Sequence, residues 1–287
     1  MIWAKIMNEE LKMIQDEINR CVYETFNGVS GYDGFSIPCI PRISSQYLKN
    51  RFVILAQETN TWYPNVGHFQ DLASSKYCNL EKILYENCYD DFCQWASETY
   101  KGAFWDFSRF LYSDEGVLCG PIHQDKYLTH CWMNLFCIEK CRNKRDRFGR
   151  PSQNRNLAEF IVKIQKDLVF KILKIIKPKT ILAMTGYQND SFLIENGLGT
   201  SFDRVDFYSI DKENIYSRNH IAEIKINDEN NPLSKTKIIR SYHPNFFTKR
   251  INRKNIFKEI GQKIMERFGK TKSQYYREIL LDSLKSE

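Results

Sequence analysis

The sequence lacks any apolar run of roughly 20 residues, the length that a membrane-spanning helix requires. Its first residues also lack the basic start and the apolar core of a signal peptide. We therefore expect a cytoplasmic protein with no membrane partner. No GxGxxG or GxxxxGK(S/T) motif is present, and those are the glycine-rich loops with which many α/β enzymes hold nucleotide phosphates. Their absence disfavours one alternative for this chain, an unrelated nucleotide-binding α/β enzyme.

The cysteines do not form a metal-binding pattern. There are nine, an odd number, and none lies in a CxxC pair. The closest pairs are Cys88 with Cys93 and Cys137 with Cys141, and neither spacing is typical of a zinc or iron–sulfur site. We expect reduced, mostly buried thiols, no metal and no organic cofactor.

The chain of 287 residues is long enough to bury a substantial core. We expect one domain over 1–287, with a core at about 51–258 and helical extensions at 1–50 and 259–287. The net charge of +7 is concentrated in two basic segments, 140–155 and 240–258, and each follows an apolar run. These segments either form a positive rim around one site or are ordinary solvated surface. We expect a monomer.

Short apolar runs and helical spacing alternate along the chain. The runs that are rich in β-branched or aromatic residues predict buried strands at 52–56, 128–139, 180–186 and 237–242. Apolar spacing predicts helices over 92–113 and 156–176 and a short one at 192–197, and alternation at 222–226 predicts an antiparallel strand. This order is typical of an α/β fold, a three-layer α/β/α sandwich around a central, mainly parallel four-stranded sheet.

Polar side chains follow the predicted strands. Right-handed crossovers bring the carboxyl ends of parallel strands to one edge of the sheet, and ligands bind there in open α/β sheets. The residues expected at that edge are Gln57, Glu58, Asn60, Asn134, Gly186 and His243. Bland alternatives exist: Glu58 and Asn60 as loop residues, Asn134 as a buried amide bonded to backbone, and His243 as a structural histidine before a proline turn.

Four segments, in this order, resemble motifs of the uracil-DNA glycosylase superfamily. They are ILAQETN at 54–60, WMNLFC at 132–137, IKPKTILAMTG at 176–186 and SYHPNFF at 241–247. The resemblance spans about 51–254. It implies that fold and a monofunctional DNA glycosylase, which hydrolyses the N-glycosidic bond of a flipped-out pyrimidine in double-stranded DNA and leaves an abasic site.

The resemblance also implies roles for three residues. Glu58 matches the water-activating carboxylate, Asn134 the base-reading amide and His243 the catalytic imidazole. The chemistry agrees, because the departing pyrimidine gains negative charge, which a donor on His243 can stabilise. The sugar gains positive charge, which Glu58 can stabilise while it orients water. Gln57 and Phe69 are further expected substrate contacts, and Trp62 and Tyr63 are alternatives to Phe69 for stacking on the base.

The segment after His243 is the expected DNA-binding region. Phe246 and Phe247 stand where the family inserts an apolar wedge into the hole left by the flipped base, and Asn245 stands where the family's motif usually has serine. The alternative is that one or both rings belong to the core. The expected phosphate contacts are Lys249, Arg250, Arg253 and Lys254.

Asn60 departs from the family in a way that concerns the substrate. The family has a tyrosine there that closes the pocket beside C5 of the base, whereas Asn60 is small and polar. It leaves volume, a donor and an acceptor at C5. We therefore expect a C5-modified cytosine, such as hydroxymethylcytosine or its glucosylated form, which some bacteriophage genomes contain, and a role in antiviral defence. The alternatives are uracil repair and a non-catalytic DNA-binding module on the same fold.

Overall fold

A computed structural model describes residues 2–26, 40–57, 93, 97–99, 101–124, 127–138, 154–248 and 255–286. It contains a six-stranded sheet in the order β4-β1-β5-β8-β7-β6. The strands are β1 (Phe52–Ala56), β4 (Cys131–Asn134), β5 (Thr180–Ala183), β6 (Val205–Ser209), β7 (Ile221–Ile226) and β8 (Lys237–Ser241). A separate small hairpin pairs β2 (His123–Gln124) with β3 (Tyr127–Leu128).

The predicted α/β fold is confirmed, and the sheet is wider than predicted. Strands β4, β1, β5 and β8 pair in parallel, as the apolar runs indicated. Two antiparallel strands, β7 and β6, extend the sheet beyond β8. The alternation in 222–226 predicted β7, whereas β6 was missed because only Val205 of its five residues is buried. An edge strand with little burial carries little apolar signal.

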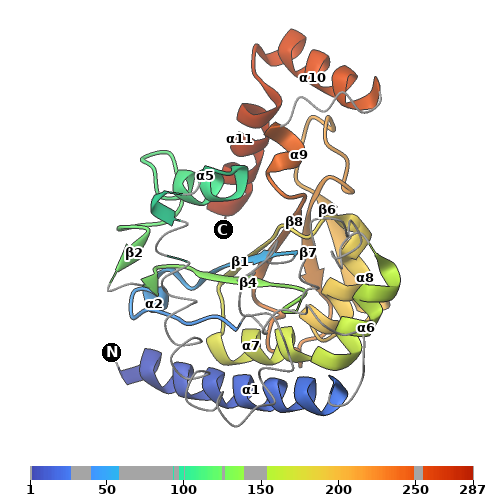
Figure 1. Cartoon of the computed structure of the whole chain (residues 1–287). Coiled ribbons are helices and arrows are strands. Elements are labelled where there is room, and N and C mark those ends of the chain that lie inside the picture. Colours follow the sequence, from blue (N-terminus) through green and yellow to red (C-terminus); the bar gives the residue numbers. More distant parts are fainter. Residues whose placement is uncertain are drawn as a thin grey trace.

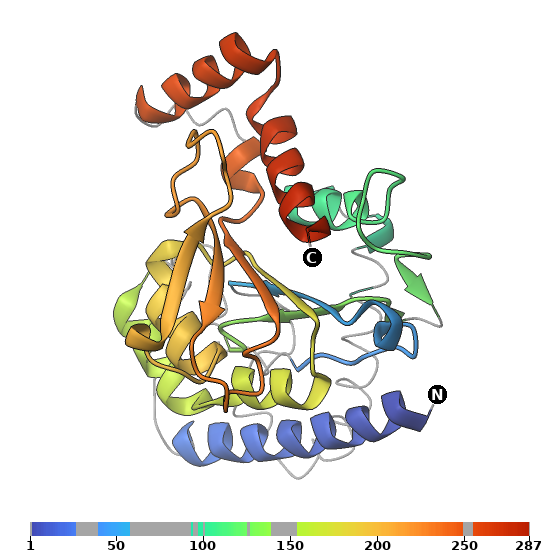
Figure 2. The ribbon, with the colours of Figure 1, turned by 180° about the vertical axis from the view of Figure 1, so that it is seen from behind.

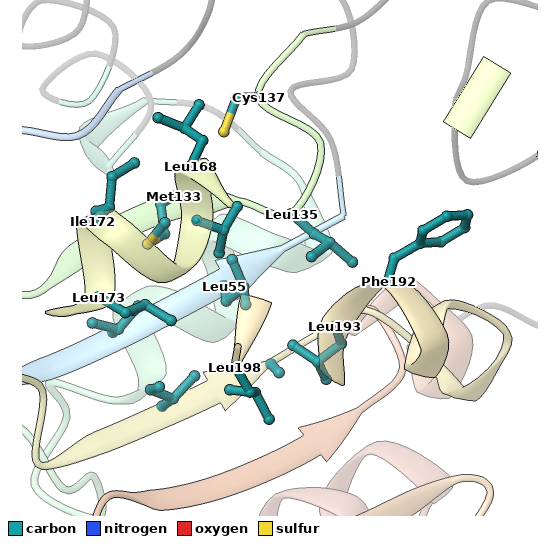
Figure 3. Packing of buried hydrophobic residues seen from close by; sticks show 14 of the residues in the cluster. Leu55, Met133, Leu135, Cys137, Leu168, Ile172, Leu173, Phe192, Leu193 and Leu198 are labelled. Atoms are coloured by element: carbon teal, nitrogen blue, oxygen red, sulfur yellow. The ribbon is translucent and has the colours of Figure 1, made fainter. Parts of the chain in front are cut away.

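One face of the sheet is covered by helices α6 (Arg155–Gln165) and α7 (Leu168–Ile176), with α8 (Asp190–Phe192) and the π-helix η3 (Leu193–Gly197) beside them. Helix α1 (Ile2–Phe26) packs against α6 and α7 from outside (Figure 1). Figure 3 shows Leu55 and Met133 of the strands facing Leu168, Ile172 and Leu173 of α7. Side chains of α1 also enter this core, so the amino-terminal extension is packed as part of it.

The other face is covered by α5 (Ala103–Phe110) and α11 (Lys272–Lys285), with α9 (Asn245–Thr248) at the end of β8. Helix α10 (Asn255–Phe268) lies farthest from the sheet in both views (Figures 1 and 2). Residues of β1 alternate between the two cores: Phe52 and Ile54 face α5, and Val53 and Leu55 face α7. The remaining short helices are α2 (Tyr47–Asn50), η2 (Tyr187–Asn189) and η4 (Phe202–Arg204).

Several predicted elements differ in extent. The helix expected over 92–113 does not continue through Gly102, which is extended, and α5 begins after it and ends at Phe110. The single helix expected over 156–176 is two helices, because Lys166 adopts a positive φ of 47° that ends α6 before α7 begins. The strand expected over 128–139 is only β4, and the residues before it belong to the small hairpin. Helix α7 ends at Ile176, just before Pro178 as predicted, with Lys177 left-handed between them. None of the helices in the described ranges combines the length and the apolarity needed to cross a bilayer.

Candidate active site

The carboxyl ends of the four parallel strands meet at one edge of the sheet. Asn134 is paired with Ala56, and Leu55 with Ala183, which in turn is paired with Arg240. The segments that follow β1, β5 and β8, together with the last residue of β4, therefore lie at the same level. Because neighbouring strands are about 4.8 Å apart, β4 and β8 are separated by about 14 Å across this edge. The prediction that Gln57, Asn134, Gly186 and His243 share one rim is confirmed for their backbone positions.

Asn134 is the most unusual polar residue of this rim. Its side chain is fully buried, and neither Oδ1 nor Nδ2 has a hydrogen-bond partner within the described chain. It follows the alternation of Trp132, which packs in the core beneath α5, so its amide points to that face of the sheet. Within the described residues, this amide is not bonded to the backbone, so the structural alternative for Asn134 does not hold there.

The turn after Asn134 is fixed by backbone and side-chain contacts. Leu135 N–H donates to Ala56 O at 2.8 Å, and Phe136 N–H donates to Gln57 O at 2.9 Å. The buried Gln165 amide, at the end of α6, donates to Leu135 O at 2.7 Å and accepts from Cys137 N–H at 3.1 Å. The unpaired Asn134 amide is therefore held in a rigid frame.

His243 follows β8 and faces the same side as Asn134. Its Nδ1 accepts the backbone N–H of Asn245 at 3.2 Å, which places the proton of a neutral imidazole on Nε2. The ring is half-buried and stacks on Phe104 of α5, with centroids 5.8 Å apart and an angle of 24° between the planes. Phe104 also contacts Trp132, with centroids 6.3 Å apart. One ring of α5 thus contacts both His243 and Trp132, which lies two residues before Asn134.

Gln57 and Thr185 tie β1 to β5 at this rim. The Gln57 amide donates to Thr185 O at 2.6 Å, and the Asn189 amide donates to the same oxygen at 2.7 Å. Gln57 therefore holds the turn after β5, and its expected contact with substrate stays a prediction. The Thr185 hydroxyl is buried without a hydrogen-bond partner in the described part of the chain.

The prediction that Phe247 projects as a wedge into DNA is wrong in this structure. Its side chain is 2% exposed and stacks on Tyr276 of α11, with centroids 3.6 Å apart and planes within 10°. A ring buried in this way belongs to the core and does not project as a wedge. Phe246 is half-buried and stacks on Tyr242, so it keeps an accessible part. Asn245 serves His243 through its backbone.

Several predicted site residues lie outside the described residues. They are Glu58, Asn60, Phe69, Lys249, Arg250 and Arg253, with Trp62, Tyr63 and Lys254. The sequence analysis missed Phe104, which belongs to a segment read only as a packing helix. Its signal was the dense aromatic spacing of residues 104–107, which the helical period alone could not separate from ordinary core.

The described residues define an α/β protein with an amide and an imidazole on one face of the carboxyl edge of its sheet. Within these ranges, no group of three or more histidine, cysteine or acidic side chains is arranged to hold a metal ion. Comparison with known proteins adds no relative, because no family model, no curated protein and no solved structure matches the chain.

Proposed function

We propose that this chain is a monofunctional DNA glycosylase that removes a flipped-out pyrimidine and leaves an abasic site. The observation that carries the proposal is the Asn134 amide, buried with both polar atoms unpaired within the described residues. A buried polar group without a partner costs about 1–3 kcal/mol. A ligand that pairs with the amide explains why the fold keeps it. The Watson–Crick edge of a flipped base offers a donor and an acceptor side by side.

His243 supports the same reaction. Cleavage of the bond between C1′ and the base leaves its electron pair on the departing ring, where charge reaches the carbonyl oxygen. In a neutral imidazole with its proton on Nε2, the Nε2–H group can donate a hydrogen bond to that oxygen and stabilise the charge that develops there. Stacking on Phe104 and the backbone contact to Nδ1 fix the ring before substrate arrives.

Water supplies the new bond to C1′. Glu58, two residues beyond β1, is the proposed acceptor of the water's proton, and this role rests on the sequence. The same holds for Asn60, whose small polar side chain favours a C5-modified cytosine over uracil. Double-stranded DNA is the proposed partner, with phosphates held by the basic run that follows α9.

The test is base release from matched duplexes. Each carries uracil, hydroxymethylcytosine or glucosylated hydroxymethylcytosine at one position, and alkali converts an abasic site into a strand break. We expect cleavage at a C5-modified base, and about 100- to 1,000-fold slower release by His243→Ala. His123→Ala is the matched control, because His123 lies in the small hairpin before β4, where it pairs with Glu98 of a preceding segment.

The outcomes separate the alternatives. Release of uracil alone would favour the alternative of uracil repair. Binding of every duplex without release of any base would make it a non-catalytic DNA-binding module. Equal rates for His243→Ala and His123→Ala would show that the site lies elsewhere.

A further inference from the structure

A second group of aromatic rings lies on the same rim as His243. Tyr242 stacks on Phe246, with centroids 4.1 Å apart and planes within 5°. Tyr187 meets the edge of Tyr242 at 6.0 Å, and His220 lies tilted against Tyr242 and Phe246 at 6.2 and 5.8 Å. These four side chains, the rim cluster, come from three separate segments: the turn after β5, the residue before β7, and the end of β8 with α9.

The rings of the rim cluster are accessible to a ligand, and hydrogen bonds fix the turn that carries Tyr187. Tyr187 is 47% exposed, and the other three rings are half-buried. The turn that carries Tyr187 is held by the two amides that donate to Thr185 O, and by Gly186 N–H, which donates to Ser241 O at 2.9 Å. A large exposed ring on a rigid turn loses little entropy when a ligand stacks on it.

Gly186 shows that the turn is fitted to the Tyr242 ring. Its φ of 71° is in the left-handed region, and a Cβ there would lie 3.1 Å from Tyr242 Cδ1. Only glycine allows the backbone to take this shape so close to the ring. The close approach keeps Tyr187 and Tyr242 in contact.

The rim cluster is also uncharged. Burial, and then the charge of Arg240, lowers the pKa of His220, whose Nδ1 accepts the Ser217 N–H at 3.1 Å. Burial raises the pKa of Tyr242 to about 12, so its hydroxyl stays protonated. The exposed Arg218 lies two residues before His220 in the sequence. Neutral aromatic faces suit a nucleobase, which stacks on them whatever its identity.

We propose that Tyr187, Tyr242 and Phe246 form a stacking platform for an unpaired nucleobase of bound DNA. Tyr242 and His243 are consecutive, so the platform and the candidate catalytic imidazole both follow β8 at the same edge of the sheet. This inference rests on the proposed function for its choice of ligand. A base next to the flipped one, or its orphaned partner, is then held by stacking in place of the neighbour it lost.

The experiment measures binding, not base release. Fluorescence anisotropy is recorded with a labelled single-stranded oligonucleotide of unmodified bases. Tyr187→Ala is expected to weaken binding about 5- to 100-fold, which corresponds to the loss of stacking on one base. Tyr187→Phe keeps the ring and should bind like the unmodified protein. Tyr208→Ala is the matched control, because Tyr208 is also 47% exposed but lies on the edge strand β6.

Photocrosslinking locates the contact. An oligonucleotide that carries 5-iodouracil should crosslink to Tyr187 or Tyr242 on irradiation, as mapped by mass spectrometry. Equal affinities for Tyr187→Ala and Tyr208→Ala, or crosslinks only at other positions, would overturn the platform. If the platform binds DNA while no pyrimidine is ever released, the proposed function fails and this inference stands. If bases are released at normal rates and Tyr187→Ala binds normally, the inference alone fails.

Discussion

At the scale of single residues, the buried amides of this protein behave in two ways. Gln165, Asn189 and Asn231 each bind backbone atoms and so replace the water they lost. Asn134 is just as buried and binds nothing within the described chain. Its neighbours on that face, Trp132 among them, are apolar. A side chain that a fold keeps at a cost to its own stability is expected where function requires it.

This contrast predicts opposite effects of one substitution at two positions. Asn134→Leu removes an unpaired amide from an apolar setting and should raise the free energy of unfolding by about 1–2 kcal/mol while abolishing base release. Asn231→Leu leaves Leu198 O and Leu233 N–H without their partner and should lower it. Urea unfolding of both variants measures the difference. Destabilisation by Asn134→Leu as large as that by Asn231→Leu would mark Asn134 as a structural amide.

At the scale of elements, α11 holds the segment that carries His243. The Tyr276 hydroxyl lies 2.9 Å from the Ser241 hydroxyl, two residues before His243. The Tyr276 ring stacks on Phe247, four residues after it. One side chain of α11 thus contacts the chain on both sides of the imidazole. Thr271 and Gln274 form a capping box that begins the helix, and this fixes the position of Tyr276.

Tyr276→Phe is predicted to affect the site more than the fold. It keeps the ring stack and removes one hydroxyl contact, so it should cost about 0.5–1.5 kcal/mol of stability. Base release should fall further than this loss explains, because the turn after β8 gains freedom. Tyr275→Phe is the control: Tyr275 lies on the same helix, and its substitution removes a contact of 2.9 Å to Asp211 that is not part of that turn. Two-dimensional NMR of the His243 ring should show a change only in Tyr276→Phe.

At the scale of the whole molecule, two buried groups give stability opposite dependences on pH. Burial lowers the pKa of His130 from 6.5 to about 3. Between these two pH values the imidazole is protonated in the unfolded chain and neutral in the folded one. Stability therefore falls as pH drops below 6.5. Burial raises the pKa of Asp190 from 3.8 to about 6 against the opposing charge of Arg240, so the folded chain keeps a proton that the unfolded one releases. Stability therefore falls as pH rises through that window.

The two effects should separate in variants. Between pH 4 and 6, His130→Gln leaves Asp190 unopposed, so the free energy of unfolding should fall more steeply with rising pH than in the unmodified protein. Asp190→Asn should shift the slope the other way, each by up to about 1.4 kcal/mol per pH unit. Ser108→Ala, beside His130, removes no titrating group and should change stability equally at each pH. Slopes that do not differ would show that neither group is held in the state described.

The sequence predicted the parallel strands because β-branched runs such as 52–56 and 180–183 are buried on both faces and leave a strong signal. It also placed Asn134 and His243 at one edge, since strand ends follow from strand positions. It could not separate Phe247 from Phe246, because adjacent rings differ only in the tertiary contacts they make. The break at Lys166 was equally hidden, since apolar residues keep helical spacing across it.

The place of α11 in this architecture has a consequence for how the protein is made. Ribosomal synthesis delivers β1, β4, β5 and β8 before α11, yet Tyr276 and Leu280 complete the core on the α5 face. Domains settle as units during translation, and an apolar surface that waits for its cover is exposed to aggregation. Asn134 and His243 are therefore synthesised before α11, and the turn that carries His243 gains its contacts with Tyr276 only once that helix has been made.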